Sequence, residues 1–278
     1  GHQSGAIVVW RLFLKRDSAG GGVIKQRIKL IRDSHLQAVV HVAFLDGHHS
    51  RCISCDLGGV LCVQLIAKRP LLKNSFNVTT AQVLDGGAGP VHALAVLEPD
   101  HRLRHHIADQ YSLVAFATRR RTHLLSLHVD QKRRLQYSHI RRPVSADDGE
   151  SLPQLHWRQV TTEDVLEAQH SGKAPDPVLA IGWGTELQLL QVVSETEFVT
   201  TARWQCSTRI TGVRWLGTQA VCVLHEREKL TVVDPYAMKA LQTTTTDGLQ
   251  VVYHNRFGVN SSLSSSPAMR RTQSMVTG

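Results

Sequence analysis

The sequence lacks the short motifs that mark most enzymes and nucleotide-binding proteins. It has no G-x-S-x-G elbow and no Walker lysine motif. The loop Asp85–Pro90 is rich in glycine, but a strand pattern follows it, so no helix N-terminus is offered to an anion. No nucleophile motif or pair of acids stands at the strand ends. We therefore expect no enzyme activity, no cofactor and no small-molecule substrate.

Long apolar runs are also missing. No stretch approaches the ~18 residues that a membrane-spanning helix needs. The composition, 42% hydrophobic and 20% charged, is that of a globular protein with a substantial core. No signal peptide is visible, and the chain begins at Gly1 rather than Met, so we expect it to be a fragment of a larger protein.

Cysteine is scarce and odd in number, which suits a reducing cytosol better than a disulfide framework. Cys52 and Cys55 have the spacing of a zinc knuckle, but residues three apart on a strand point to opposite faces. No second pair follows, so we expect small side chains packed between strands and no metal, with zinc the minor alternative. The five cysteines are Cys52, Cys55, Cys62, Cys206 and Cys222.

What the chain does contain is a repeat of apolar strands separated by turns. The clearest copy is Val39–Leu65, in which two apolar runs are joined at Gly58 and Gly59 as a hairpin. Such a unit cannot bury its own faces and must stack on further copies, as the blades of a β-propeller do. WD-type blades repeat every ~40–45 residues, and loop insertions explain the longer intervals here.

The predicted fold is therefore all-β: a WD-type β-propeller fragment of about four to five four-stranded antiparallel blades, spanning 1–255. Residues 256–278 are rich in serine and predict a flexible loop or linker. Thr161–His170 predicts one short inserted helix, with Thr161 as its N-cap, and an irregular loop is the alternative. Glu98–Gln110 is expected to be a polar, His-rich loop.

Strand positions follow from the apolar runs, the fourth strands being the most polar. The first strands are expected at Val39–Leu45, Val91–Leu97, Leu155–Val160 and Ile210–Leu216, and the second at Ile53–Asp56, Ser112–Thr118, Val178–Trp183 and Ala220–His225. The third are expected at Ala6–Trp10, Val60–Leu65, His123–Val129, Glu186–Val192 and Lys229–Asp234, and two fourth strands at Phe198–Trp204 and Leu241–Thr246.

Two groups of residues are candidates for a role. Asp56, Gly58 and Gly59 are expected to shape the Cys55–Val60 turn, because glycine adopts positive φ. Positive charge is concentrated in 101–142, which holds ten Arg or Lys against two Asp. Solvated loop tips are the alternative to partner binding there. The candidate partner-binding residues in that segment are Arg119, Arg120, Arg121, Lys132, Arg133 and Arg134.

Several modest motifs follow one another along the chain. They are Cys55–Gly59 (CDLGG), Leu152–Trp157 (LPQLHW), Asp176–Gly184 (DPVLAIGWG), Val213–Leu216 (VRWL), Glu228–Tyr236 (EKLTVVDPY) and Leu249–Asn255 (LQVVYHN). In this order they resemble the N-terminal propeller of the vacuolar protein sorting-associated protein 8 family, whose members are subunits of the CORVET tethering complex. The resemblance covers most of residues 35–255.

This resemblance implies a non-enzymatic scaffold in endosomal vesicle tethering, supporting Rab-dependent fusion and transport to the vacuole or lysosome. The implied partners are other tethering-complex subunits and a GTP-bound early-endosomal Rab GTPase, with peripheral association on early or late endosome membranes from the cytoplasm. The alternative is a propeller adaptor that binds nucleic acid or ribonucleoprotein through its basic blade. The basic loops are split between two faces and lack aromatic neighbours, so nucleic acid is not the expected partner.

Overall fold

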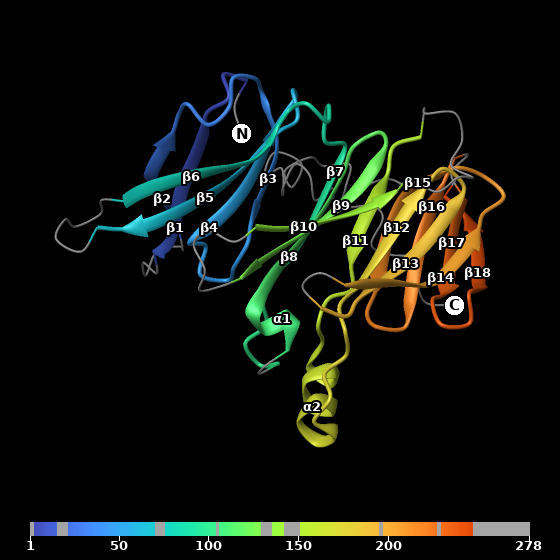
Figure 1. Ribbon diagram of the computed structural model, residues 1–278. Helices are drawn as coiled ribbons and strands as arrows, with labels where there is room; N and C mark the ends of the chain where they lie inside the picture. Colours follow the sequence, from blue (N-terminus) through green and yellow to red (C-terminus); the bar gives the residue numbers. More distant parts are fainter. Residues whose placement is uncertain are drawn as a thin grey trace. The chain divides into compact units, whose positions relative to one another are not determined.

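The described residues form four four-stranded antiparallel sheets and one two-stranded sheet (Figure 1), which confirms the predicted all-β propeller fragment. The described residues 3–244 belong to one compact unit. The predicted boundary at residue 255 lies outside the described residues and stays a prediction. The computed structural model describes residues 3–15, 22–69, 76–103, 106–128, 135–141, 151–194, 197–226 and 229–246.

Each four-stranded sheet uses four consecutive strands, placed side by side in chain order. The two-stranded sheet is a hairpin of β1 (Ile7–Lys15) and β2 (Gly22–Ile31). The first two four-stranded sheets are β3 (Val39–Phe44), β4 (Arg51–Asp56), β5 (Val60–Lys68) and β6 (Phe76–Asp85), and β7 (Ala93–Leu97), β8 (Tyr111–Ala117), β9 (Arg121–His128) and β10 (Leu135–Arg141). The other two are β11 (Gln154–Trp157), β12 (Val178–Trp183), β13 (Glu186–Val192) and β14 (Phe198–Gln205), and β15 (Ile210–Leu216), β16 (Ala220–His225), β17 (Lys229–Asp234) and β18 (Lys239–Thr245).

Burial along the strands follows their place in the sheet. The inner strands β8, β12 and β13 are buried at nearly every residue, because neighbouring sheets cover both of their faces. The fourth strands β6 and β14 are largely open to water, and β18 is exposed at every residue. Threonine is common in these outer strands because it suits a pleated surface that faces water.

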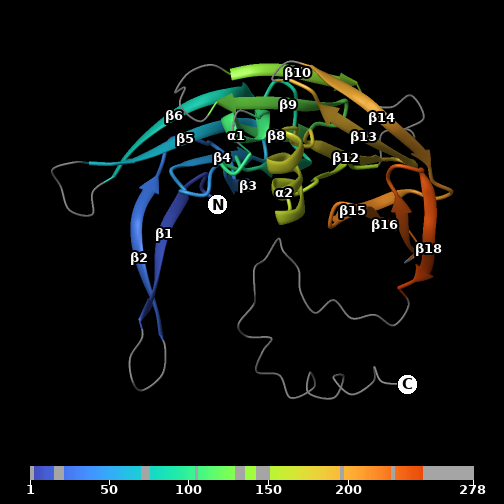
Figure 2. The same cartoon turned by 90° about the horizontal axis from the view of Figure 1, so that it is seen from below.

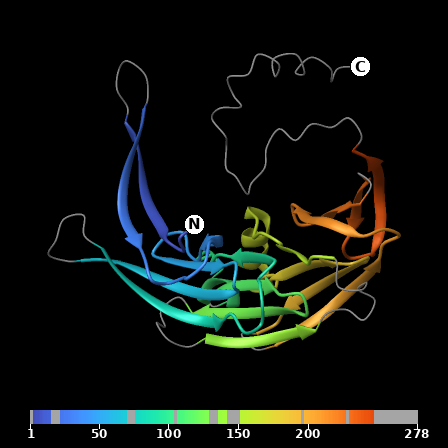
Figure 3. The same ribbon diagram turned by 90° about the horizontal axis from the view of Figure 1, so that it is seen from above.

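Apolar side chains from consecutive sheets fill the space between them. Trp157 and Leu179 pack with Leu113 and Leu97 of the preceding sheet. Leu187 packs in the same way with Val213 and other side chains of the following sheet. Sheets that are neighbours in the chain are therefore neighbours in space (Figure 3).

The first strands also join neighbouring sheets through hydrogen bonds. The Trp157 indole Nε1–H donates to the carbonyl of Ala95, 3.2 Å away on the preceding sheet. The Trp215 amide donates to Nδ1 of His156 at 3.2 Å. Burial, with the nearby Arg214 guanidinium as a smaller cause, lowers the pKa of His156 to about 4, so this imidazole is neutral and can accept. Polar contacts thus fix how the blades sit against each other.

In the described part of the chain, the helices α1 and α2 project from one end of the sheets (Figures 1 and 2). The helix α2 (Thr162–Ser171) begins at the N-cap Thr161, which forms a capping box with Asp164, and ends at Gly172 with φ 69°. This confirms the predicted helix with a shift of one residue. Val165 of α2 packs against Leu103 and Ala108 from the insertion before β8.

The prediction that Glu98–Gln110 is entirely a loop was wrong, because its last four residues form the short helix α1 (Ile107–Gln110). His106 is its N-cap, accepting from the Ala108 amide at 3.2 Å, and its Nε2 lies 3.4 Å from Asp176 Oδ1. Histidine is not among the preferred capping residues, so the pattern carried no start signal. The expected strand Ala6–Trp10 is also longer, since β1 reaches Lys15.

Candidate functional site

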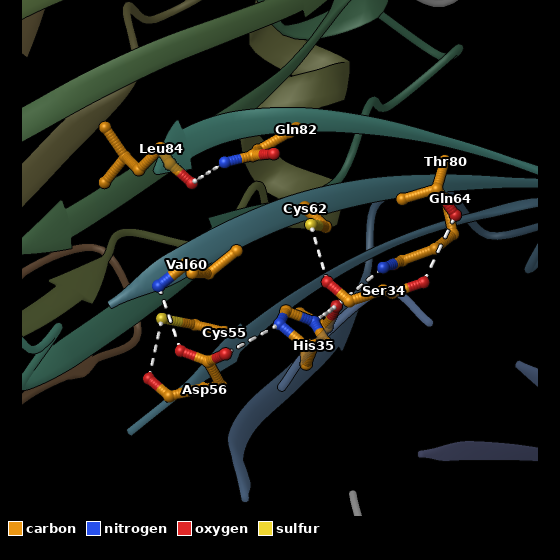
Figure 4. Close-up of polar contacts among 11 residues, drawn as sticks. Ser34, His35, Cys55, Asp56, Val60, Cys62, Gln64, Thr80, Gln82 and Leu84 are labelled. Atoms are coloured by element: carbon orange, nitrogen blue, oxygen red, sulfur yellow. Dashed lines mark hydrogen bonds and ion pairs between the residues drawn. The ribbon is translucent and has the colours of Figure 1, made fainter. Parts of the chain in front are cut away.

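The β4–β5 turn is built around a buried contact between His35 and Asp56. His35 Nδ1 lies 3.4 Å from Asp56 Oδ2, and the two residues are 4% and 1% exposed. His35 Nε2 lies 2.6 Å from Ser54 Oγ, and Gln64 Nε2–H donates to the same oxygen at 2.7 Å. Figure 4 shows His35 beside Asp56, with Gln64 on the far side. The network therefore runs from β5 through β4 to the link before β3.

The protonation of His35 follows from this network. Burial lowers the pKa of His35, outweighing the attraction of Asp56, so the ring is neutral near neutral pH. A proton on Nδ1 faces Asp56 and leaves Nε2 to accept from the Ser54 hydroxyl, which in turn accepts from Gln64. With this tautomer His35 Nε2 and the Ser54 hydroxyl are both hydrogen-bonded, and the Nδ1 proton faces the Asp56 carboxylate at 3.4 Å without a well-formed hydrogen bond. The network acts as a structural clamp.

The turn residues predicted from the sequence sit directly on this clamp. Asp56 Oδ1 accepts the Val60 amide at 3.0 Å, and the Asp56 carbonyl accepts the Gly59 amide at 3.1 Å. Gly59 has φ 87°, and a Cβ placed there would lie 2.1 Å from the carbonyl oxygen of Gly89. Gly58, by contrast, does not have the positive φ expected of it, and a Cβ there would approach only the end of the flexible Gln37 side chain, with Nε2 at 2.9 Å.

The cysteines of this blade are buried and donate hydrogen bonds. Cys55 Sγ donates to the carbonyl of Asp56 at 3.4 Å, and Cys52 Sγ to Gln64 Oε1 at 3.3 Å. Burial raises the pKa of Cys55 to about 12 and that of Cys52 to about 11, so both remain thiols. A thiol is neither a nucleophile nor a metal ligand. Within the described ranges, no group of three or more His, Cys, Asp or Glu is arranged to hold a metal ion.

A second polar cluster links the sheet of β3–β6 to the sheet of β7–β10. The Arg51 guanidinium donates to Asp46 Oδ2, to the carbonyl of His128 and to Ser112 Oγ, each at 3.0 Å. The Ser112 hydroxyl donates at 2.6 Å to the carbonyl of Leu45. Burial alone would raise the pKa of Asp46, but the Ser50 amide and the Arg51 guanidinium lower it below its usual value. Asp46 is therefore ionised, and Arg51 bridges two blades.

The predicted basic residues are divided by the structure. Arg119 and Arg120 lie in the β8–β9 turn, Arg121 begins β9, and all three are exposed. Arg141, at the end of β10, pairs in register with Arg121. Arg102 lies before α1, at the opposite end of β8. The candidates Lys132, Arg133 and Arg134 lie outside the described residues, so their role stays a prediction.

Comparison with known proteins identifies the family. A family model described as the Vps8 beta-propeller matches residues 1–277. The chain belongs to this family. The recognition made from the ordered motifs is thereby confirmed. No curated protein matches the chain.

Solved structures similar to this Vps8-family propeller are WD40 proteins. The Chaetomium thermophilum Sqt1 structure, bound to the N-terminus of ribosomal protein L10, has a TM-score of 0.53 at 10% identity, covering 87% of this chain and 57% of that one. The Neurospora crassa Pan2 WD40 domain has a TM-score of 0.42 at 12% identity, covering 74% of this chain and 49% of that one. The chain thus spans about half the length of these solved chains, and the Sqt1 likeness concerns the fold alone.

Sequence reasoning missed most members of the His35 clamp. A usable signal was present, because Ser34-His35 precedes the first strand of the clearest repeat, where WD40 repeats carry Gly-His. Ser54 and Gln64 had no such signal, since each is an ordinary strand residue. The Arg51 cluster was also missed, because its partners Ser112 and His128 lie 61 and 77 residues further along the chain.

Proposed function

We propose that this chain is the N-terminal propeller of a non-enzymatic subunit of an endosomal vesicle-tethering complex of the CORVET type. The observation that carries the proposal is the match of the Vps8 propeller model to residues 1–277. In this role the whole protein supports Rab-dependent endosome fusion and transport to the vacuole or lysosome. It acts from the cytoplasm, peripherally on early or late endosomes, and assembles with other tethering subunits.

The architecture supports a scaffold. WD40 folds and the Vps8 family are typically non-enzymatic, and the buried polar groups described above hold turns and blades in place. No helix among the described residues is long and apolar enough to cross a membrane. The alternative, an adaptor for nucleic acid or ribonucleoprotein, is not favoured, because nothing in the family match points to it.

The Rab-dependent part of the proposal is tested by a binding measurement. The full-length protein is passed over an early-endosomal Rab GTPase loaded with a GTP analogue or with GDP. We expect retention at least about tenfold stronger in the GTP state, because the switch loops are ordered only by the γ-phosphate. The same Rab in its GDP form and a GTP-loaded Rab of another compartment are the controls. Equal binding to both nucleotide states would contradict Rab-dependent tethering.

A further inference from the structure

One end of the sheets carries exposed charged and apolar side chains that take no part in the His35 clamp or in the contacts between blades. This end carries the link 32–38 before β3, the β4–β5 turn 57–59, the link 86–92 before β7 and the β8–β9 turn 118–120. We call it the turn face. It lies opposite the end that carries α1 and α2, because successive antiparallel connections emerge at alternate ends of a sheet.

The basic triplet Arg119–Arg121 on the turn face has no carboxylate partner within the described part of the chain. Five other arginines of the described chain do have a carboxylate partner: Arg51 with Asp46, Arg102 with Asp100, Arg158 with Asp164, Arg203 with Glu186 and Arg209 with Glu226. Three adjacent, exposed and unpaired guanidinium groups repel one another and attract anions. The triplet therefore offers positive charge that the fold itself does not neutralise.

Two large apolar side chains protrude from the same face. Leu36 is 95% exposed and Leu57 is 53% exposed, and both stand on turns rather than in a sheet. Their loops are in contact, since the Leu57 amide donates to the carbonyl of Ala38 at 2.9 Å. Projecting leucines on neighbouring turns do not line a hollow for a protein side chain, but they can enter the boundary between lipid headgroups and acyl chains.

A chain of close contacts leads from the leucines toward the triplet. Gly59, two residues after Leu57, lies against the Gly89 carbonyl in the next link. Further along that link is His92, whose pKa is lowered by burial and by the charge of Arg119. The exposed leucines and the basic triplet thus lie on neighbouring turns and links of two adjacent blades.

Charge on the opposite end is mixed. The exposed carboxylates Glu98, Glu163 and Glu167 stand there beside the exposed Lys68, Arg69 and Lys173. What distinguishes the turn face is that a basic triplet and two exposed leucines occur on neighbouring turns. An acidic peptide would use the triplet alone, whereas a membrane surface uses both the charge and the leucines, so the combination favours a membrane surface.

We propose that the turn face docks on a membrane rich in anionic lipid, with the basic triplet on the headgroups and Leu36 and Leu57 inserted among them. The proposal deepens the proposed tethering function and rests on it: the propeller would lie flat on the endosomal surface, with α1 and α2 facing away. Basic residues near an anionic leaflet and shallow apolar insertion each strengthen binding.

The test measures partition of the full-length protein onto phosphatidylcholine vesicles with and without phosphatidylserine. We expect binding to the anionic vesicles only. Arg119→Glu, Arg120→Glu and Arg121→Glu together should weaken it by at least about a hundredfold. Leu36→Ser with Leu57→Ser should weaken it by about tenfold or more. All five side chains are exposed, so circular dichroism should show folded variants, and Arg120→Glu alone serves if the triple variant is not folded.

Matched controls come from the opposite end. Lys68→Glu, Arg69→Glu and Lys173→Glu make the same change in net charge, and Leu166→Ser removes a leucine that is 50% exposed on α2. These controls should bind vesicles like the unchanged protein. Equal loss in the controls, or no binding to anionic vesicles, would overturn the proposal. If the unchanged protein bound no vesicles, and the triple arginine variant lost binding to an acidic protein, the turn face would be a binding site for that protein instead. Rab binding in the GTP state can persist in either case, so failure here is distinct from failure of the tethering function.

Discussion

Gly59→Val is expected to lower the free energy of unfolding by at least about 3 kcal/mol. The left-handed backbone at φ 87° already costs a side chain about 1–2 kcal/mol, and β-branched residues tolerate it worst. The larger part comes from a clash, because the new Cβ would stand 2.1 Å from the oxygen and 2.7 Å from the carbon of the Gly89 carbonyl. Equilibrium denaturation with urea measures the change.

Gly89→Val is the matched control for that substitution. Gly89 also has positive φ, at 79°, but a Cβ there meets nothing within 4 Å. Gly89→Val should therefore lower the free energy of unfolding only by the backbone strain, about 1–2 kcal/mol. The difference between the two variants isolates the contact between the β4–β5 turn and the link before β7. Equal stability of the two variants would show that this contact is absent.

Arg51→Met is expected to destabilise the protein by about 2–3 kcal/mol. The substitution keeps much of the side-chain volume but removes the charged partner of the Asp46 carboxylate, which keeps only its Ser50 donors, and the donor to the Ser112 hydroxyl oxygen. It also removes the hydrogen bond to the His128 carbonyl on the neighbouring sheet. Because the bond to His128 and the bond to Ser112 both cross between blades, loosening should be greatest there, which amide hydrogen exchange can locate.

Arg102→Met provides the comparison. Arg102 also pairs with an aspartate, Asp100, but its side chain is 53% exposed, whereas that of Arg51 is 13% exposed. Exposed ion pairs contribute little to stability, so no measurable change in urea denaturation is expected. If Arg51→Met also left the free energy of unfolding unchanged, the Arg51 cluster would not hold the two blades together.

The strand framework was predictable because each strand carries its own signal. Val178–Trp183, Glu186–Val192, Ala220–His225 and Lys229–Asp234 were predicted with the bounds that the structure has. Apolar runs broken by turn residues depend on local sequence alone. The helix α2 was predictable for the same reason, since its cap residue and its terminal glycine lie within a short segment.

What could not be predicted depends on residues far apart in the chain. The His35 clamp needs two strands and a link to come together, and Arg51 reaches partners on another blade. The helix α1 forms because its insertion packs against α2, which its own sequence does not reveal. The basic segment was recognisable from its charge. Only the structure shows that Arg119–Arg121 have no carboxylate partner among the described residues and that exposed leucines lie on neighbouring turns.

The most direct test of the tethering assignment is affinity purification of the full-length protein from its own cells, with every co-purified protein identified by mass spectrometry. The account predicts stoichiometric recovery of the other subunits of an endosomal tethering complex, surviving washes at moderate salt. A matched purification from cells that lack the tag removes background. Recovery of ribonucleoproteins with no tethering subunit would contradict the assignment.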